Sequence, residues 1–245
     1  MLVTDETNIC FLTTVVINKI LKRRDDKMID LEEMGMYLEE PEKYLEEIEK
    51  YLEEIETLYM FVDTTYAFSI IGLLADPYVL HTVPELVRMA QIASSDKKAK
   101  KVFFIDWHSK DSVELERFLE HGMDGTIEVK IIPQLQPYAK DALIFRKNSR
   151  SAIFAKNFIK TILKMKNLKK VVIGGWDTDL CVIDLAIPLQ NLFDEINKRV
   201  EIIVPKNAVE TYDSPTHNRD EYNNMAFKLM EQEGIKVVKK LERKR

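Results

Sequence analysis

The sequence predicts an α/β fold, a doubly wound and mostly parallel sheet with helices on both faces. Two observations support this prediction. After Thr57, short apolar runs rich in β-branched and aromatic residues alternate with longer stretches of helical periodicity. The short runs are almost continuously apolar, which is typical of strands that are covered on both faces. Regular alternation of strand and helix is the pattern of parallel sheets, because each helix carries the chain back across the sheet.

The predicted elements follow one another in a regular order. The strands are the short apolar runs at residues 58–62, 102–106, 142–145, 171–175, 201–204 and 236–238. The helices are the longer periodic segments at residues 83–94, 153–165, 180–196 and 219–232. In an open parallel sheet, ligands bind outside the carboxyl ends of the strands. The residues that directly follow each strand are therefore the first candidates for a functional site.

The region before this alternation has a different character. We predict two parts, a helical extension over residues 1–57 and the α/β domain over residues 58–245. From Asp30 to Glu56 twelve acids accompany only two bases, a local charge of -10, so the rest of the chain carries +5. The net charge of -5 therefore comes from one acidic segment and not from a uniformly acidic surface.

An internal repeat of seven residues runs through the acidic segment. Its apolar positions form one stripe at helical spacing: Leu45, Ile48, Leu52 and Ile55. Pro41 suits the first turn of a helix, so we expect the helix to begin there. Two clean heptads are too few for a coiled coil. We therefore favour a helix packed on its own domain over a helix that forms a homo-oligomer.

Composition and charge exclude several classes of protein. With 245 residues, 46% of them hydrophobic, the chain can build a large core, which excludes global disorder. A net charge of -5 argues against a nucleic-acid partner, which needs a basic face. The apolar run at residues 10–17 is too short to span a bilayer and follows acids, so no membrane partner is expected. Two cysteines are too few for a disulfide framework, and a cytoplasmic location follows as the expectation.

Residues able to do chemistry follow four of the predicted strands. Asp63 follows the first strand, Asp106 and His108 the second, Lys147 the third, and Cys181 lies shortly after the fourth. Because parallel strands end at the same edge of the sheet, these side chains are expected to meet there. Cys181 alone could be an inert core cysteine, but at the start of a helix its thiolate would be favoured.

A metal site is a second hypothesis for the same edge. Asp106 and His108 lie on one face of an extended segment, and His121 comes later in the chain. One oxygen and two nitrogen ligands suit zinc, manganese or iron. On spacing alone, a site without metal remains the more common interpretation of such a set.

The ordered set of motifs from about Leu58 to Lys240 resembles the isochorismatase-like cysteine hydrolases, and within them the nicotinamidases. The resemblance is carried by these segments: Phe61-Val62-Asp63 with Phe68, Asp106-Trp107-His108 with Asp111-Ser112, His121 to Thr126, Lys147 before Ser151-Ala152, and Gly175 to Val182. The stretch from Val204 to Val238 also resembles the last strand, helix and strand of that family. The segment before Thr57 is not covered.

The resemblance implies a catalytic triad of Asp63, Lys147 and Cys181. It also implies a cis peptide between Trp176 and Asp177, with the amides of Asp177 and Cys181 binding the oxyanion. Cys181 would attack an amide carbonyl after giving its proton to Asp63, and Lys147 would balance the charge. This fits the chemistry of thiols, because the thiolate is the nucleophile and a nearby ammonium favours it.

The resemblance also implies the metal ligands and the substrate contacts. Asp106, His108 and His121 match the family's metal positions, and Glu114 matches a fourth position. The metal would be divalent, with zinc expected first and manganese or iron as alternatives. Phe68 and Phe154 match positions where relatives place aromatic rings against the substrate, although either ring could instead belong to the core.

The chain departs from the family pattern at three places. Thr65 stands where relatives usually have Gln, Leu119-Glu120 where they have two prolines, and Asp177 where a small residue is common. The first hypothesis is a metal-assisted nicotinamidase that serves NAD salvage. The second is a hydrolase of another small amide, a carbamoyl compound or isochorismate. The third, of a different class, is a non-catalytic protein whose N-terminal helix mediates assembly or binds a partner.

Overall fold

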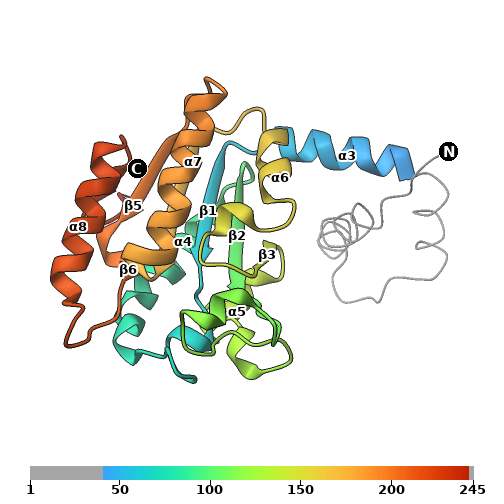
Figure 1. The fold of residues 1–245 in the computed structure, drawn as a ribbon. Coiled ribbons are helices and arrows are strands. Elements are labelled where there is room, and N and C mark those ends of the chain that lie inside the picture. Colours follow the sequence, from blue (N-terminus) through green and yellow to red (C-terminus); the bar gives the residue numbers. More distant parts are fainter. Residues whose placement is uncertain (1–40, 243–245) are drawn as a thin grey trace.

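The computed structural model describes residues 41–242, with side chains from residue 46 onward, as one parallel sheet covered by helices (Figure 1). The sheet has seven strands in the order β3-β2-β1-β4-β5-β7, and β6 pairs with the end of β4. Every strand pair is parallel. The strand order turns back between β1 and β4, which is where α/β sheets place their ligands. The predicted fold class is confirmed.

The strands and helices occupy the following residues. The strands are β1 (Thr57–Val62), β2 (Ala99–Asp106), β3 (Leu143–Lys147), β4 (Lys170–Trp176), β5 (Glu201–Pro205), β6 (Val209–Glu210) and β7 (Lys236–Val238). The helices are α3 (Pro41–Glu53), α4 (Val83–Ser95), α5 (Gln136–Ala139), α6 (Phe158–Lys164), α7 (Ile183–Glu195) and α8 (Arg219–Gln232). None of the helices within residues 41–242 is both long and apolar enough to cross a membrane.

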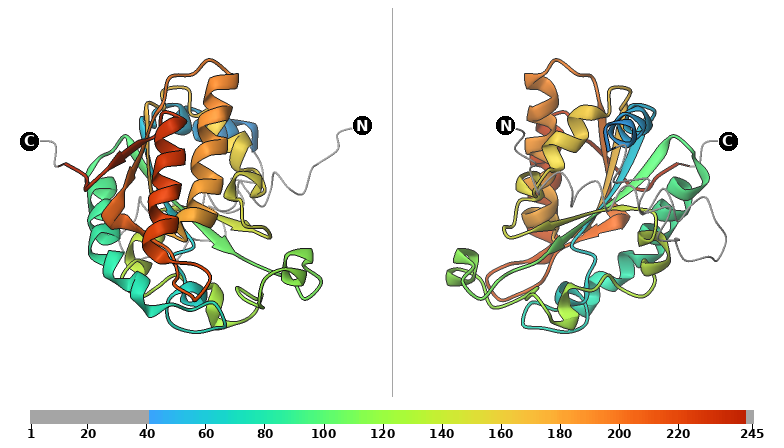
Figure 2. Two further views of the ribbon diagram at one scale, coloured as in Figure 1. Left: turned by 60° about the vertical axis from the view of Figure 1, so that its left-hand side comes forward. Right: turned by 90° about the vertical axis from the view of Figure 1, so that its right-hand side faces the viewer.

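Each face of the sheet has its own hydrophobic core, because alternate residues of each strand point to opposite faces. Leu58, Met60 and Val62 of β1 belong to one core, together with side chains of α6, α7 and α8. Tyr59 and Phe61 belong to the other core, together with side chains of α4. The two turned views show these layers, with the sheet between the two groups of helices (Figure 2).

The second half of α3 packs on the domain. Ile48, Leu52 and Ile55 are buried in the same core as α6 and α7, while the first turns of α3 extend sideways from the body (Figure 1). This agrees with a helix packed on its own domain. Pro41 is the first residue that the structure describes, so the start of the helix there stays a prediction. The domain boundary at residue 57 and the homo-oligomer stay predictions. Residues 1–40, including the run at 10–17, lie outside the described residues.

Three elements differ from the sequence prediction. The helix predicted at 153–165 is a short 3-10 turn (Ala152–Phe154) followed by α6, because Asn157 between them adopts a left-handed φ of 67°. The helix predicted at 180–196 begins with a π-helical turn (Thr178–Val182) and becomes regular in α7. Strand β6 was not predicted, because two residues are too short to show a period.

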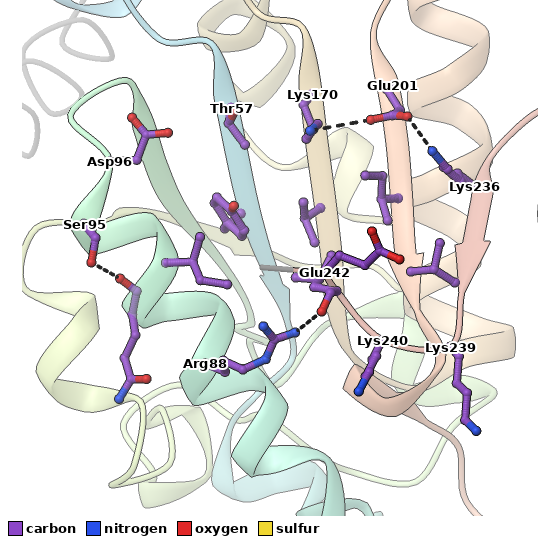
Figure 3. Close-up of a pocket in the computed structure, with 17 residues that line it drawn as sticks. Thr57, Arg88, Ser95, Asp96, Lys170, Glu201, Lys236, Lys239, Lys240 and Glu242 are labelled. Atoms are coloured by element: carbon purple, nitrogen blue, oxygen red, sulfur yellow. Dashed lines mark hydrogen bonds and ion pairs between the residues drawn. The ribbon is translucent and has the colours of Figure 1, made fainter. Parts of the chain in front are cut away.

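A groove with a cavity volume of about 950 Å³ lies on the α4 face of the sheet (Figure 3). Its rim includes Thr57, Lys170, Glu201 and Lys236, which are the first residues of their strands. Arg88 of α4 reaches across it to the carbonyl of Leu241 at 2.7 Å. The groove is therefore at the amino ends of the strands, whereas ligands of such sheets bind at the carboxyl ends.

Candidate active site

The carboxyl ends of four strands bring the expected triad together. The ammonium of Lys147, at the end of β3, lies 2.9 Å from Oδ2 of Asp63 and forms a second ion pair with Asp106. The same ammonium lies 3.9 Å from Sγ of Cys181. One ligand atom each of Asp63, Asp106 and Cys181 lies within 4.8 Å of the others. All four side chains are buried, so their charges interact with little screening by water.

The close approach of β1 and β4 positions the two sides of this cluster. Gly175 of β4 pairs with Val62 of β1, and a Cβ at Gly175 would lie 2.0 Å from the carbonyl oxygen of Val62. Only glycine fits there, and its φ of 130° also favours glycine. Directly after Val62, Asp63 adopts a left-handed φ of 53°, a conformation that is uncommon for residues other than glycine. Such strained residues often occur at functional sites.

One ammonium between two carboxylates gives the two acids different proton affinities. Burial raises the pKa of Asp63 and the neighbouring Asp106 raises it further, so that it reaches about 7 despite Lys147. Burial would also raise the pKa of Asp106, but Lys147, His108 and His121 outweigh it and hold that pKa far below its ordinary value. Asp63 is therefore the carboxyl that can take up and release a proton near neutral pH.

The thiol and the ammonium are also shifted. Burial would lower the pKa of Lys147, but Asp106, Asp63 and Cys181 hold it well above its ordinary value. Burial raises the pKa of the Cys181 thiol, and Lys147 only partly opposes this. The resting nucleophile is therefore a thiol, and forming the thiolate requires a base beside it.

Cys181 stands on the π-helical turn Thr178–Val182, which we call the Cys181 turn. The peptide between Trp176 and Asp177 just before it is cis, as the resemblance implies. The Trp176 ring is buried, and its Nε1 donates to Oγ1 of Thr82 at 3.0 Å. The carbonyl of Asp177 accepts hydrogen bonds from the amides of Leu180 and Val182. The end of β4 thus leads directly into the turn that carries the thiol.

Asp177 occupies the position where a carboxylate could oppose a developing oxyanion. Burial raises its pKa well above the ordinary value, and the nearby acids Asp179 and Asp63 raise it further. A raised pKa weakens the negative charge that Asp177 would otherwise place beside an oxyanion. A neutral carboxyl does not repel an oxyanion and can donate a hydrogen bond.

The expected metal ligands also cluster. One ligand atom each of Asp106, His108 and His121 lies within 4.8 Å of the others, and all three residues are buried. Nε2 of His108 and Nε2 of His121 lie 3.6 Å and 3.5 Å from the two oxygens of Asp106. The two imidazole rings are in edge contact, with centroids 4.7 Å apart. The atoms that would bind a metal thus converge on one point.

The hydrogen bonds of the two histidines fit a metal site. Nδ1 of His121 lies 2.6 Å from the carbonyl of Leu119, and Nδ1 of His108 lies 3.0 Å from Oδ1 of Asn148. Both partners can accept, so hydrogens on Nδ1 would leave the lone pairs on Nε2 for a metal ion. Among the described residues, Nε2 of His108 is buried and has no hydrogen-bond partner. A buried lone pair without a partner is what a bound cation would satisfy.

Three further predicted residues have different placements. Glu114 is not among the three clustered ligands, and its Oε2 instead accepts from the amide of Arg150 at 2.7 Å. Phe68 is 5% exposed, and its ring makes a T-shaped contact with the His121 ring at a centroid distance of 5.5 Å. Phe154 is 77% exposed, so the core alternative for this ring is wrong. The ligand role of Glu114 and the substrate contacts of Phe68 and Phe154 stay predictions.

Two residues around His108 were not predicted. Asn148 and Ser112 both contact Nδ1 of His108, Ser112 through its Oγ at 3.2 Å. Ser112 belongs to one of the segments that resemble the isochorismatase-like hydrolases, and Asn148 directly follows Lys147. Their positions beside other site residues were the only signal in the sequence that could have indicated them.

Comparison with known proteins agrees with this geometry. Residues 72–240 match the model of the isochorismatase domain. This match covers more than half of the chain and includes Lys147 and Cys181, while Asp63 lies before it. A search of curated proteins finds no match to this chain.

Several solved structures share the fold at low sequence identity. The nicotinamidase from Bacillus subtilis is 21% identical, with a TM-score of 0.62, and the match covers 75% of this chain and 100% of that one. The N-carbamoylsarcosine amidase from Thermoplasma acidophilum is 22% identical, with a TM-score of 0.62, and the match covers 78% of this chain and 100% of that one. The pyrazinamidase of Pyrococcus horikoshii in complex with zinc is 23% identical, with a TM-score of 0.60, and the match covers 75% of this chain and 98% of that one.

Proposed function

This chain belongs to the isochorismatase family of hydrolases, and from this premise we propose that it hydrolyses a small amide through a thioester on Cys181. One observation carries the proposal. The ammonium of Lys147 contacts the carboxylates of Asp63 and Asp106 and lies 3.9 Å from the thiol of Cys181. A base, a cation and a nucleophile in contact are the parts that covalent catalysis by a cysteine requires.

In the first half of the reaction, Asp63 takes the proton of Cys181. The ammonium of Lys147 stabilises the thiolate, which attacks the carbonyl carbon and forms a carbon–sulfur bond. The amides of Asp177 and Cys181 would donate to the oxyanion. As the carbon–nitrogen bond breaks, Asp63 returns the proton to the leaving nitrogen, and ammonia departs.

In the second half, water hydrolyses the thioester. Asp63 is again ionised and accepts a proton from the attacking water. The carbon–sulfur bond breaks, the thiolate regains a proton, and the carboxylic acid leaves. A pKa of about 7 suits Asp63 to both transfers, because the group can lose and gain a proton at similar free energy.

The residues fit a divalent metal, with Asp106, His108 and His121 as its ligands. When bound, such an ion would supply a Lewis acid beside the substrate and lower the pKa of a coordinated water. Asp106 would then contact both the ion and Lys147, since its two oxygens already face the histidines and the ammonium. Zinc is the first candidate, and manganese and iron are the alternatives.

We propose nicotinamide as the first candidate substrate, with nicotinate and ammonia as products and NAD salvage as the setting. The aromatic ring of Phe68 in contact with His121 supports this, because an aromatic side chain beside the metal ligands suits a flat aromatic substrate. The fold shared with a nicotinamidase is consistent with the same proposal.

A second candidate is another small amide or a carbamoyl compound. Asp177 favours this alternative, because it places a carboxyl in the oxyanion turn where a small residue is common in the family. The fold shared with an N-carbamoylsarcosine amidase is consistent with it. Isochorismate is the weaker alternative, because the cluster of Asp106, His108 and His121 favours an amidase.

A panel of substrates separates these candidates. Purified protein should release ammonia from nicotinamide, while a panel of pyrazinamide, N-carbamoylsarcosine and an aliphatic amide tests the alternatives. Higher kcat/KM for nicotinamide than for every other compound is the expected result. A preference for N-carbamoylsarcosine or the aliphatic amide would replace the first candidate with the second. Ammonia from none of them would contradict the proposed amidase.

Metal content tests the ligand assignment without an activity assay. His108→Ala and His121→Ala each remove one of three ligands, so each should lower bound zinc at least about tenfold in elemental analysis after equilibration with zinc and desalting. His81→Ala is the matched control, because His81 is an exposed histidine that pairs with Glu210 and not with the cluster. Wild-type metal content in both ligand variants would show that the assignment is wrong.

A further inference from the structure

His217 is a buried histidine that the proposed mechanism does not use. It lies in the segment between β6 and α8 and is only 6% exposed. Its ring is stacked between two tyrosine rings, with centroid distances of 3.9 Å to Tyr212 and 3.7 Å to Tyr222. The interplanar angles are 13° and 26°, so both faces of the imidazole are covered. The ring is therefore held in one plane.

Both nitrogens of this ring face hydrogen-bond acceptors. Nδ1 lies 3.1 Å from the carbonyl oxygen of Tyr212, and Nε2 lies 2.9 Å from Oδ2 of Asp179. A carbonyl and a carboxylate accept but do not donate, so a neutral imidazole could satisfy only one of them. The contact with the carboxylate of Asp179 is the shorter of the two. Nε2 of His217 is thus placed to donate a hydrogen bond to the carboxylate of Asp179.

Asp179 links this histidine to the nucleophile. It belongs to the Cys181 turn, two residues before Cys181, and its side chain is buried. Its second oxygen accepts from Oγ1 of Thr211, just after β6. The carbonyl of Thr211 in turn accepts from Nε of Arg219 at 2.9 Å. Both oxygens of Asp179 are therefore tied to the segment between β6 and α8.

The other hydrogen bonds of the turn do not replace this link. The carbonyl of Asp177 accepts from Leu180 and Val182, but these bonds lie inside the turn. The carboxylate of Asp179 ties the turn to the segment that follows β6, the strand that pairs with the end of β4. Small displacements of a nucleophile are costly, since about 1 Å can reduce the rate about 100-fold.

We propose that His217 is a positioning residue that holds Asp179, and through it fixes the turn that carries Cys181. The inference rests on the proposed function, in which Cys181 is the nucleophile. His217 lies 36 positions after Cys181 in the sequence and is not part of the triad. The inference gives its contact with Asp179 a role in catalysis.

The sharpest test is His217→Phe, which keeps a stacked aromatic ring and removes both nitrogen contacts. Asp179 then loses its contact with Nε2, so the turn should loosen. We expect the amides of residues 177–183 to exchange with deuterium at least about tenfold faster. With the best substrate of the panel, kcat should fall at least about tenfold while KM changes less than about threefold, because the defect lies in the position of the nucleophile.

Two matched variants separate positioning from general damage. Tyr222→Leu removes one stacked ring and leaves both nitrogen contacts, so it should lower the melting temperature and keep kcat within about threefold. His81→Phe makes the same chemical change at another histidine–carboxylate pair, with Glu210 at 3.4 Å, and should leave exchange at residues 177–183 unchanged. Asp179→Asn weakens the same contact from the other side and should show the same faster exchange and lower kcat. It replaces His217→Phe as the test if His217→Phe does not fold.

The two readouts keep this inference distinct from the proposed function. Wild-type exchange at residues 177–183 in both His217→Phe and Asp179→Asn would overturn the inference, whatever the activity. Faster exchange with unchanged kcat would also overturn it, because the turn would then move without consequence. If the wild-type protein hydrolyses no amide, the proposed function fails, and the exchange result still decides whether His217 fixes the turn.

Discussion

The Cys181→Ser variant should release ammonia at least roughly four orders of magnitude more slowly than the wild type, because hydroxyl is a far weaker nucleophile than thiolate. The site is adjusted to a thiol: Lys147 stabilises its anion from 3.9 Å, and Asp63 accepts its proton. A serine hydroxyl loses its proton much less readily, so the same base cannot activate it to the same extent. The measurement is the rate of ammonia release at saturating substrate.

The control for this variant is a substitution of the other cysteine of the chain, Cys10. Cys10→Ser makes the same chemical change in the segment that the resemblance does not cover, and should keep kcat within about twofold of the wild type. Substantial ammonia release by Cys181→Ser, or its loss in Cys10→Ser, would remove Cys181 from the role of nucleophile.

Replacing Lys147 by methionine should damage both stability and activity. Methionine has a similar length but no charge, so Asp63 and Asp106 would remain buried beside each other without their shared cation. Removing one partner of a buried ion pair costs about 3–5 kcal/mol in the free energy of unfolding. The activity should fall at least about 1000-fold, because the thiolate loses its ammonium and Asp63 holds its proton more tightly. Urea unfolding and ammonia release measure the two effects.

Lys101→Met is the matched control for the charge. Lys101 is also a buried lysine, and its ammonium lies 2.8 Å from Asp141, at the opposite end of β2 from the site. This variant should lose stability and keep kcat within about threefold. If Lys147→Met retained wild-type kcat, or if Lys101→Met lost as much activity, the special role of Lys147 would be contradicted.

The strands and the reactive residues at their carboxyl ends could be predicted, because buried parallel strands have a strong local signal in the sequence. The run from Leu58 to Val62 is apolar throughout, and Asp63 ends it with a charge. Such a contrast marks both the strand and its carboxyl end, where parallel sheets bind ligands. The convergence of Asp63, Asp106, Lys147 and Cys181 followed from this rule, because all four come at or just after a strand end.

The remaining features depend on contacts between distant parts of the chain. The His217–Asp179 pair joins residues 38 positions apart. Both lie in segments that resemble the family, but nothing within either segment indicates that the two side chains meet. Asn148 supports His108 from another strand end, again without a local signal. The short strand β6 exists because it pairs with the end of β4, which only the folded sheet provides. Periodicity reports burial along one element and does not report such partners.

The residues that form the metal cluster could be predicted only in part. Asp106 and His108 lie two residues apart and could be expected on one face, and the structure brings His121 to them. Glu114 lies in the same segment, but its carboxylate binds the amide of Arg150. Sequence spacing places a residue near a site, whereas the direction of its side chain depends on the backbone groups that it meets.

The central claim is that the reaction passes through a thioester on Cys181. The most direct measurement is mass spectrometry of the peptide that contains Cys181, after acid quenching of the enzyme during turnover of its best substrate. The proposed mechanism predicts an added mass equal to the acyl group of that substrate minus one hydrogen, on Cys181 and absent from Cys181→Ser. An unmodified Cys181 throughout turnover, together with full ammonia release by Cys181→Ser, would contradict it.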